Sequence, residues 1–286
     1  MNVEGFRRAC ALLPARLRTL VADSPLGGET EELRLRAGQP LFLAGPWGER
    51  AAGGEVSPGD LEAVLDAATG HSLYTASETM RQGFFTAQGG LRIGVCGLVS
   101  AGREGVEAFR SFSSLSIRIP RQRRGVGTEL AEEWLAEGLP SLLLAGPPGE
   151  GKTTLLRDVV RQISGRGVRV GLADERGEVA AVFRGRPQLD VGPHTDILEG
   201  CPKALALPML LRAMAPRVIA VDEVAVAEDV AAMALAANSG VSLLATVHAA
   251  SLEELGRKRL FQQMRELFPK VLLLRREQGR YRLERL

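Results

Sequence analysis

The stretch "GPPGEGKTT" at residues 146–154 directly follows the apolar run "SLLLA" at 141–145. Its spacing, G-x-x-x-x-G-K-[ST], is typical of a phosphate-holding loop between a buried strand and a helix. Because glycine has no Cβ, the backbone N–H groups of such a loop can curl around phosphate oxygens. The following helix directs its positive end at the same oxygens. The sequence therefore predicts a nucleotide-binding loop formed by Gly146, Pro147, Pro148, Gly149, Glu150, Gly151, Lys152, Thr153 and Thr154.

Hydrolysis needs acids as well, and the apolar strand "RVIAV" at 217–221 ends in Asp222 and Glu223. The carboxyl ends of strands are where an open α/β sheet presents its chemistry. We expect ATP and Mg²⁺ as cofactors, with Lys152 placing charge on the outer phosphates and Thr153 ligating the metal. Asp222 would hold the metal through water, and Glu223 would polarise the attacking water. The alternative is that the acidic pair only caps the next helix.

Two further strands end in polar residues. "VGLADERGE" carries Asp174, Glu175 and Glu178, and "ATVHAA" carries Thr246 and His248. Each strand end alone is weak evidence, because a lone histidine at such a position is more often structural than catalytic. A parallel sheet would align all of them along one edge beside the phosphate loop, where a Thr or His is placed to sense the γ-phosphate.

The pattern of elements changes part-way along the chain. Before it changes, the expected elements are helices at 6–21 and 59–69, a further helix in the first part of 70–82, two strands and a turn at 31–43, a hairpin around "QGG" from Gly83, and a strand at 114–120. Afterwards apolar strands alternate with helices, which indicates a parallel sheet covered on both faces. The fold class is therefore α/β: a smaller α+β domain at 1–124, then a P-loop ATPase domain at 125–286 with a mainly parallel sheet that ends in a β-hairpin.

The segment "RQRRGVG" at 121–127 breaks the pattern and is expected to be a linker between the two domains. Its arginines could also touch nucleic acid or lipid head groups, but a solvated linker is the simpler interpretation.

Composition narrows the class of protein. The net charge of +2 argues against a general nucleic-acid binder, and the three cysteines lie far apart, which fits free thiols in a reducing compartment. The first residues lack the apolar stretch of a signal peptide, and no run approaches the roughly 20 apolar residues of a membrane span. We therefore expect a cytoplasmic protein whose contact with a membrane is made through partners.

Several of these motifs occur together in one family. The order of phosphate loop, acid-rich strand, acidic strand and "T-x-H" strand resembles the ATPases of type II and type IV secretion and of pilus retraction. The whole chain is more similar still to the stage III sporulation protein AA family. The segments that carry this resemblance are "EELRLRAGQPL" (31–41), "GGLRIGVCG" (89–97), "SLSIRIP" (114–120), "DERGE" (174–178), "RAMAPRVIAVDE" (212–223) and "ANSGVSLLATVH" (237–248).

The resemblance implies a RecA-like ATPase that forms a ring, by analogy a hexamer. Such a protein would act with membrane-embedded channel or secretion-complex proteins, on the mother-cell side of the forespore membrane. In the wider superfamily two arginines of the amino-terminal domain reach the nucleotide, and the matching positions are Arg92 and Arg118. They could instead be solvent-facing or paired within their domain. Secretion ATPases also use an acid of the "DERGE" region, so the catalytic base is either Glu223 or one of Asp174, Glu175 and Glu178.

A second hypothesis is a RecA-like ATPase that acts on DNA or RNA. The basic cluster at 121–124 has no aromatic residue beside it, and aromatic residues make up only 5% of the chain. Nucleic-acid motors present basic surfaces with aromatic side chains for stacking, so this composition argues against nucleic acid as a partner. A nucleotide-gated adaptor without turnover fits poorly with an intact acidic pair.

Overall fold

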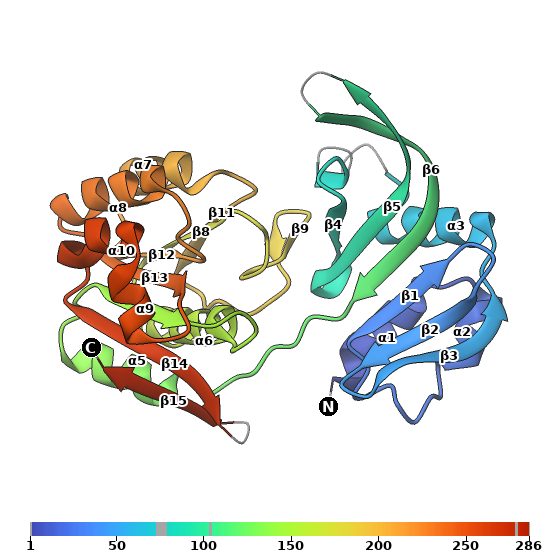
Figure 1. Cartoon of the computed structure of the whole chain (residues 1–286), viewed down its shortest axis with the longest axis horizontal. Helices are drawn as coiled ribbons and strands as arrows, with labels where there is room; N and C mark the ends of the chain where they lie inside the picture. Colours follow the sequence, from blue (N-terminus) through green and yellow to red (C-terminus); the bar gives the residue numbers. More distant parts are fainter. Residues whose placement is uncertain (1, 73–78, 103–104, 278–279, 286) are drawn as a thin grey trace. The chain divides into compact units, whose positions relative to one another are not determined.

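The computed structural model describes residues 2–72, 79–102, 105–277 and 280–285 (Figure 1). Two compact units make up the chain. The first comprises Met1–Arg121 together with Phe183–Gln188, and the second comprises Gln122–Val182 together with Leu189–Leu286. The chain therefore passes between the units three times, at 121/122, 182/183 and 188/189. In the described part of the chain, no helix is long and apolar enough to cross a bilayer.

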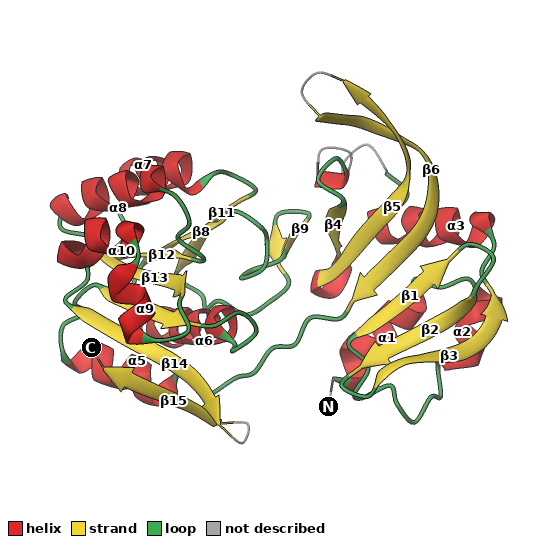
Figure 2. Cartoon of the chain, in the orientation of Figure 1, coloured by secondary structure: helices red, strands yellow, loops and turns green. Residues whose placement is uncertain are grey.

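The first unit is built on a six-stranded antiparallel sheet in the order β3-β2-β1-β6-β5-β4 (Figure 2). Its strands are β1 (Glu32–Arg36), β2 (Pro40–Gly45), β3 (Gly48–Glu55), β4 (Phe84–Ala87), β5 (Leu91–Gly102) and β6 (Gly105–Arg118). The strands at 31–43, the hairpin around "QGG", which forms a 3₁₀ turn at Gln88–Gly90, and the strand ending before Pro120 are confirmed.

One face of this sheet is apolar and the other is charged. Side chains alternate along β1, where Leu33 and Leu35 are buried while Arg34 and Arg36 are only partly buried. The apolar face packs against helices α1 (Val3–Ala11), α2 (Ala15–Val21) and α3 (Pro58–Thr69).

The helices of the first unit begin and end where local chemistry requires. The single helical stretch expected at 6–21 is two helices, because α2 starts after Pro14, which lacks the N–H that a helix interior needs. Helix α3 confirms the prediction at 59–69. It starts in a capping box between Ser57 and Asp60, and Gly70 closes it with φ +63°. The helix expected in the first part of 70–82 falls largely on residues outside the described ranges.

The second unit holds a seven-stranded sheet in the order β11-β8-β12-β13-β7-β14-β15. Every neighbouring pair is parallel except β14 and β15, the terminal hairpin. The strands are β7 (Leu142–Gly146), β8 (Val170–Asp174), β11 (Thr195–Glu199), β12 (Val218–Val221), β13 (Ser242–His248), β14 (Lys270–Glu277) and β15 (Arg280–Arg285). The mainly parallel α/β sheet and the final hairpin are confirmed.

Both faces of this sheet are buried, as the continuous apolar strands predict. Alternate residues of β7 separate the faces: Leu143 and Ala145 pack with one set of helices, while Leu142 and Leu144 pack with the other. The first set is α7 (Lys203–Met214), α8 (Ala227–Asn238), α9 (Leu252–Arg257) and α10 (Arg259–Met264), with a 3₁₀ turn at Arg265–Leu267, and the second set is α5 (Thr128–Ala136) and α6 (Lys152–Gly165) (Figure 2).

The strand order decides where the polar strand ends lie. Strands β8, β12, β13 and β7 are consecutive neighbours, and their registers run in parallel toward the same edge. The acids after β12, the "DERGE" turn after β8, the end of β13 and the phosphate loop after β7 therefore meet at one edge of the sheet.

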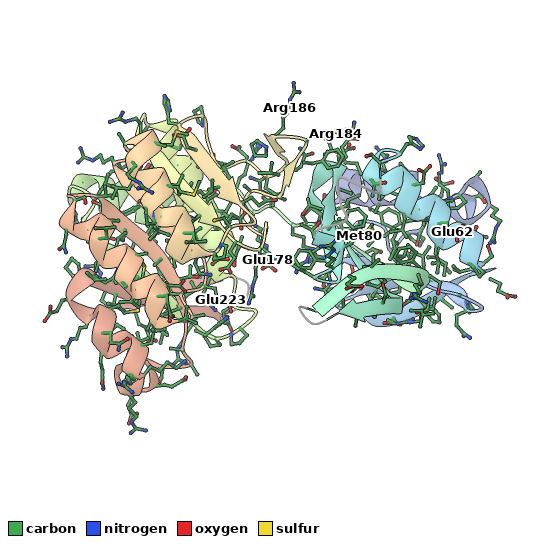
Figure 3. All side chains as sticks on the ribbon, turned by 90° about the horizontal axis from the view of Figure 1, so that it is seen from above. Glu62, Met80, Glu178, Arg184, Arg186 and Glu223 are labelled. Carbon is green, nitrogen blue, oxygen red and sulfur yellow. The ribbon has the colours of Figure 1, made fainter. Side chains whose placement is uncertain are left out.

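A short hairpin leaves the second unit and belongs to the first. It consists of β9 (Val182–Phe183) and β10 (Arg186–Pro187), and Figure 3 labels Arg184 and Arg186 on it. Within the first unit Arg184 donates to the carbonyl of Gly70 at 3.2 Å, and the side chain of Gln188 accepts from the N–H of Gly89 at 2.8 Å. Sequence patterns did not predict this hairpin, because two-residue strands carry no periodicity.

The expected linker is bound to protein partners on both sides of the unit boundary. Arg121 pairs with Glu31 at 2.9 Å in the first unit. In the second unit the amide of Gln122 donates to the carbonyl of Asp190 at 3.1 Å, and Arg124 pairs with the Asp190 carboxylate at 3.0 Å. Three of the polar side chains in this segment therefore have intramolecular partners.

Candidate functional site

The phosphate loop has the backbone that its sequence predicts. Gly149 and Gly151 have φ values of +80° and +92°, which glycine adopts without strain. A Cβ on Gly151 would also clash with the hydroxyl of Tyr281 on β15, so the backbone conformation and this contact both favour glycine. Within the described residues no acceptor bonds the backbone N–H groups of 149–151. Free N–H donors just before the N-terminus of α6 form a cradle that fits phosphate oxygens.

Lys152 folds back onto its own loop. Its ammonium donates to the carbonyls of Gly146 at 2.9 Å and Pro147 at 2.8 Å, and it lies 2.9 Å from Nδ1 of His248. Burial lowers the pKa of Lys152, while the charges of Asp222 and other nearby carboxylates oppose that shift. The lysine is thus a buried cation held at the mouth of the loop by weak carbonyl partners.

Asp222 joins three segments of the chain. Its Oδ2 accepts a hydrogen bond from the hydroxyl of Thr153 at 2.7 Å, and its Oδ1 accepts one from the hydroxyl of Thr246 at 2.6 Å. Hydroxyl and carboxylate oxygens are ligands that Mg²⁺ prefers, and such sites use one or two protein groups beside phosphate oxygens. The pair of Thr153 and Asp222 therefore fits the predicted metal site.

Glu223 lies at the same edge in a conformation that is rare for its residue type. Its φ is +57°, in the left-handed region that L-residues other than glycine, Asn and Asp seldom adopt. Its carboxylate contacts Arg176 at 2.8 Å and Nε2 of His248 at 3.3 Å. Figure 3 labels Glu223 and Glu178, which both lie at this edge of the second unit.

His248 connects the lysine to the glutamate through its two ring nitrogens. An ammonium can only donate, so Nδ1 of His248 accepts from Lys152, and in the neutral ring the proton is on Nε2, facing Glu223. Lys152, His248, Glu223 and Arg176 thus form a continuous polar chain along the sheet edge.

Asp174 lies at the end of β8 and is 1% exposed. Its Oδ1 accepts from the N–H of Glu178 at 3.0 Å, and its Oδ2 accepts from Val179 at 3.0 Å and Ala180 at 2.8 Å. Burial raises its pKa, and the three backbone hydrogen bonds oppose that shift. Both carboxylate oxygens are therefore committed to holding the "DERGE" turn.

The other acids of this region have different surroundings. Glu175 is ion-paired with Lys203 on α7. The backbone carbonyl of Glu178 accepts from the buried guanidinium of Arg157, which also donates to the carbonyl of Val179 at 2.6 Å. The structure thus separates the acids that the sequence grouped together.

Arg92 and Arg118 lie on the charged face of the first unit. They are directly opposite each other on β5 and β6 and line a hollow of about 270 Å³ together with Arg34 and Arg36. The guanidinium of Arg92 lies 3.8 Å from the ring centre of Phe84, and Arg118 is 4.0 Å from the carboxylate of Glu32.

Four residues of the second unit were missed by the sequence analysis: Arg157, Arg176, Glu199 and Tyr281. A buried charge in an apolar helix face could have drawn attention to Arg157, which lies in "LLRDVV". Arg176 lies within the quoted "DERGE", but an arginine in a turn carries no signal of its own. Glu199 and Tyr281 lie on strands whose sheet neighbours only the fold reveals.

The family model for sporulation stage III, protein AA matches residues 7–284. The chain belongs to this family. Stage III sporulation protein AA of Bacillus subtilis (strain 168) is 34% identical over 289 residues, which cover 94% of this chain and 90% of that protein. The segments that suggested this resemblance thus identified the family correctly.

Solved structures with a similar fold include secretion-type ATPases. The ATPase DotB of Legionella pneumophila has a TM-score of 0.56 at 16% identity, covering 90% of this chain and 76% of DotB. The pilus retraction motor PilT with bound ADP has a TM-score of 0.61 at 17% identity, covering 90% of this chain and 78% of PilT. The chain therefore has the fold of the RecA-like secretion ATPases.

Substitution of Asp174 by Asn tests whether its main role is structural. The amide replaces one acceptor oxygen with a donor that faces a backbone N–H, and each buried group left without a partner costs about 1–3 kcal/mol. We expect Asp174→Asn to lower the urea midpoint of the second unit clearly, whereas Asp196→Asn, an exposed change on β11, should leave it unchanged. A variant that unfolds like the wild type but loses turnover would assign Asp174 a chemical role.

Glu199 makes the stability of the second unit depend on pH. Burial raises its pKa to about 7. The hydrogen bond from the N–H of Val182 opposes this rise, and the nearby charge of Asp174 adds to it. A carboxyl whose pKa is higher in the folded state binds protons more tightly there, so stability rises as pH falls from 8 toward 5.

The variant Glu199→Gln should remove this dependence. Allowing for partial exposure to solvent, we expect it to be more stable than the wild type by about 1–2 kcal/mol at pH 8, with the difference shrinking by pH 5.5. The measurement is urea unfolding at several pH values, with the exposed Glu132→Gln as control. Parallel pH profiles for wild type and Glu199→Gln would contradict the prediction.

Proposed function

We propose that this chain is a Mg²⁺-dependent, secretion-type ATPase. The observation that carries the proposal is the carboxylate of Asp222, which is hydrogen-bonded to the phosphate-loop residue Thr153 and to the next strand end at Thr246. The metal-binding acid and the metal-binding hydroxyl are thereby held together beside Glu223 and Lys152. This is the arrangement that hydrolysis of a nucleotide phosphate needs.

The loop residues 146–154 would hold the phosphates of ATP through backbone N–H groups, and Thr153 with Asp222 would hold Mg²⁺. The metal would neutralise charge on the phosphate oxygens. Lys152 is placed to give up carbonyl partners for phosphate oxygens, which are stronger acceptors for an ammonium.

Glu223 is our choice for the general base. Its carboxylate is half-open to water, and Arg176 and His248 direct it from two sides. Asp174 is the weaker candidate because both of its oxygens are occupied by backbone N–H groups. Glu175 is weaker because its carboxylate pairs with Lys203 on α7, whereas Glu223 is connected through His248 to Lys152 of the phosphate loop. Asp174 and Arg157 would instead shape the turn that carries Arg176.

Arg92 and Arg118 would neutralise the γ-phosphate, either of their own subunit or of a neighbour. Support comes from their position on a charged sheet face, where the two further arginines have carboxylate partners of their own: Arg34 pairs with Glu32 at 2.8 Å and Arg36 with Glu49 at 3.2 Å. The Glu32 contact of Arg118 is long, at 4.0 Å, and the arginine side chain is 63% exposed, so the contact holds that side chain weakly.

The cellular role follows from the family and the fold. We propose a ring, with six copies by analogy, that powers assembly or operation of a channel between mother cell and forespore. Its partners would be membrane-embedded channel or secretion-complex proteins at the mother-cell side of the forespore membrane.

Substitution Glu223→Gln tests the base. The amide keeps the shape of the side chain and loses the proton acceptor, so we expect turnover to fall by about 10²–10⁴-fold with ATP binding retained. Steady-state ATPase assays and calorimetric titration with ATP measure the two effects, and Glu228→Gln, exposed at the start of α8, is the control. If turnover survives in Glu223→Gln but is lost in Glu175→Gln or Glu178→Gln, the base lies on the "DERGE" turn.

Substitution Arg118→Ala tests the arginine face. ADP lacks the γ-phosphate, so we expect hydrolysis of ATP to fall by about 10²–10³-fold while affinity for ADP is retained, and Arg92→Ala should behave in the same way. Arg110→Ala, an exposed change on the same strand β6, serves as control. Undiminished turnover in both variants would assign these arginines to the structure of their own unit.

A further inference from the structure

Thr246 lies one residue past the last paired position of β12 and β13, where the two strands begin to separate. Its side chain is fully buried, with 0% exposed. The parallel pairing ends at Val221 opposite Ala245, so Thr246 faces the turn that carries the acidic pair. A buried hydroxyl at this point needs partners, and it finds them in that turn.

Three successive residues of the acidic turn bond to Thr246. Its hydroxyl donates to Oδ1 of Asp222 at 2.6 Å and accepts from the N–H of Glu223 at 2.7 Å. Its backbone carbonyl accepts from the N–H of Val224 at 2.9 Å. The hydroxyl therefore acts once as donor and once as acceptor, which uses the two-sided capacity that a threonine has and a valine lacks.

These contacts fix the orientation of the Asp222 carboxylate and the backbone conformation of Glu223, the two features of the turn that matter most for hydrolysis. With Oδ1 bonded to Thr246 and Oδ2 bonded to Thr153, the carboxylate of Asp222 has a single orientation. The backbone of Glu223 is in the left-handed region, which costs free energy unless surrounding contacts hold it. The hydrogen bond to its N–H is one such contact.

We propose that Thr246 is a positioning residue for hydrolysis. Its hydroxyl holds the Asp222 carboxylate and the Glu223 backbone in place beside Thr153. This proposal rests on the function proposed above. Both hydrogen bonds of the Thr246 hydroxyl are made to the acidic turn, so its role is indirect. It acts by preventing rotation of the Asp222 carboxylate and relaxation of the Glu223 backbone.

The hydroxyl can be removed almost without a change in shape. Thr246→Val keeps the branched side chain and the backbone bond to Val224, but it loses both hydroxyl bonds. Thr246→Ser keeps the hydroxyl and loses a methyl group. The matched control is Thr30→Val in the first unit, because Thr30 is 1% exposed and, among the described residues, its hydroxyl bonds only to the carbonyl of Leu26, at 2.9 Å.

Two readouts are measured on the full chain: kcat for ATP, and the Mg²⁺ concentration that gives half-maximal binding of ADP by calorimetry. Loss of a residue that orients a metal ligand typically costs about 10–100-fold in activity or metal affinity. We expect Thr246→Val to lose about 10–100-fold in kcat and to need about 10-fold more Mg²⁺. Binding of ADP without Mg²⁺ should be unchanged, Thr246→Ser should restore most of both readouts, and Thr30→Val should alter neither.

The proposal is overturned if Thr246→Val keeps the Mg²⁺ dependence of the wild type. It is also overturned if Thr246→Ser loses as much kcat and Mg²⁺ affinity as Thr246→Val, because the shape of the side chain rather than its hydroxyl would then matter. Should the valine variant lack a cooperative thermal transition, Thr246→Ala replaces it under the same criteria. A wild-type protein that binds ADP with Mg²⁺ but does not hydrolyse ATP would overturn the ATPase proposal alone, because the Mg²⁺ readout still decides the role of Thr246.

Discussion

The carboxylate of Asp222 is the constraint on which the candidate site depends. It accepts hydrogen bonds from Thr153, 69 residues earlier, and from Thr246, 24 residues later. Both bonds require that the strands leading to these residues lie together in one parallel sheet, in which β13 stands between β12 and β7. The apolar strands β7, β12 and β13 thus place the site, and the bonds of Asp222 then hold its phosphate loop, acidic turn and third strand end together.

The two acidic strand ends illustrate how surroundings separate residues of the same type. Asp222 has two threonine hydroxyls as partners, and it is the acid that we propose to hold Mg²⁺. Asp174, on the adjacent strand, is buried and bonded to three backbone N–H groups, so its charge stabilises a turn. Arg157 supports the same turn through the carbonyls of Glu178 and Val179. The same turn holds Arg176 against Glu223, so Asp174 orients the proposed base indirectly.

The chain path limits how the two units can be connected. The boundary at 121/122 is accompanied by two further crossings around the β9–β10 hairpin, which belongs to the first unit although it continues from the "DERGE" turn. Only Ala181 lies between Ala180, the last residue that donates to Asp174, and Val182, the first residue of the hairpin.

The sequence by itself determined the phosphate loop, the parallel sheet, the terminal hairpin and the family, because each depends on local spacing or on motifs that lie within one segment. The positive φ of the loop favours glycine at 149 and 151, and alternation along β1 separates its buried leucines from its arginines. Tertiary structure alone decided which acids share the site. The order β8-β12-β13-β7 and the burial of Asp174 and Thr246 arise from packing between strands that are distant in the sequence, and such packing leaves no periodic trace in it.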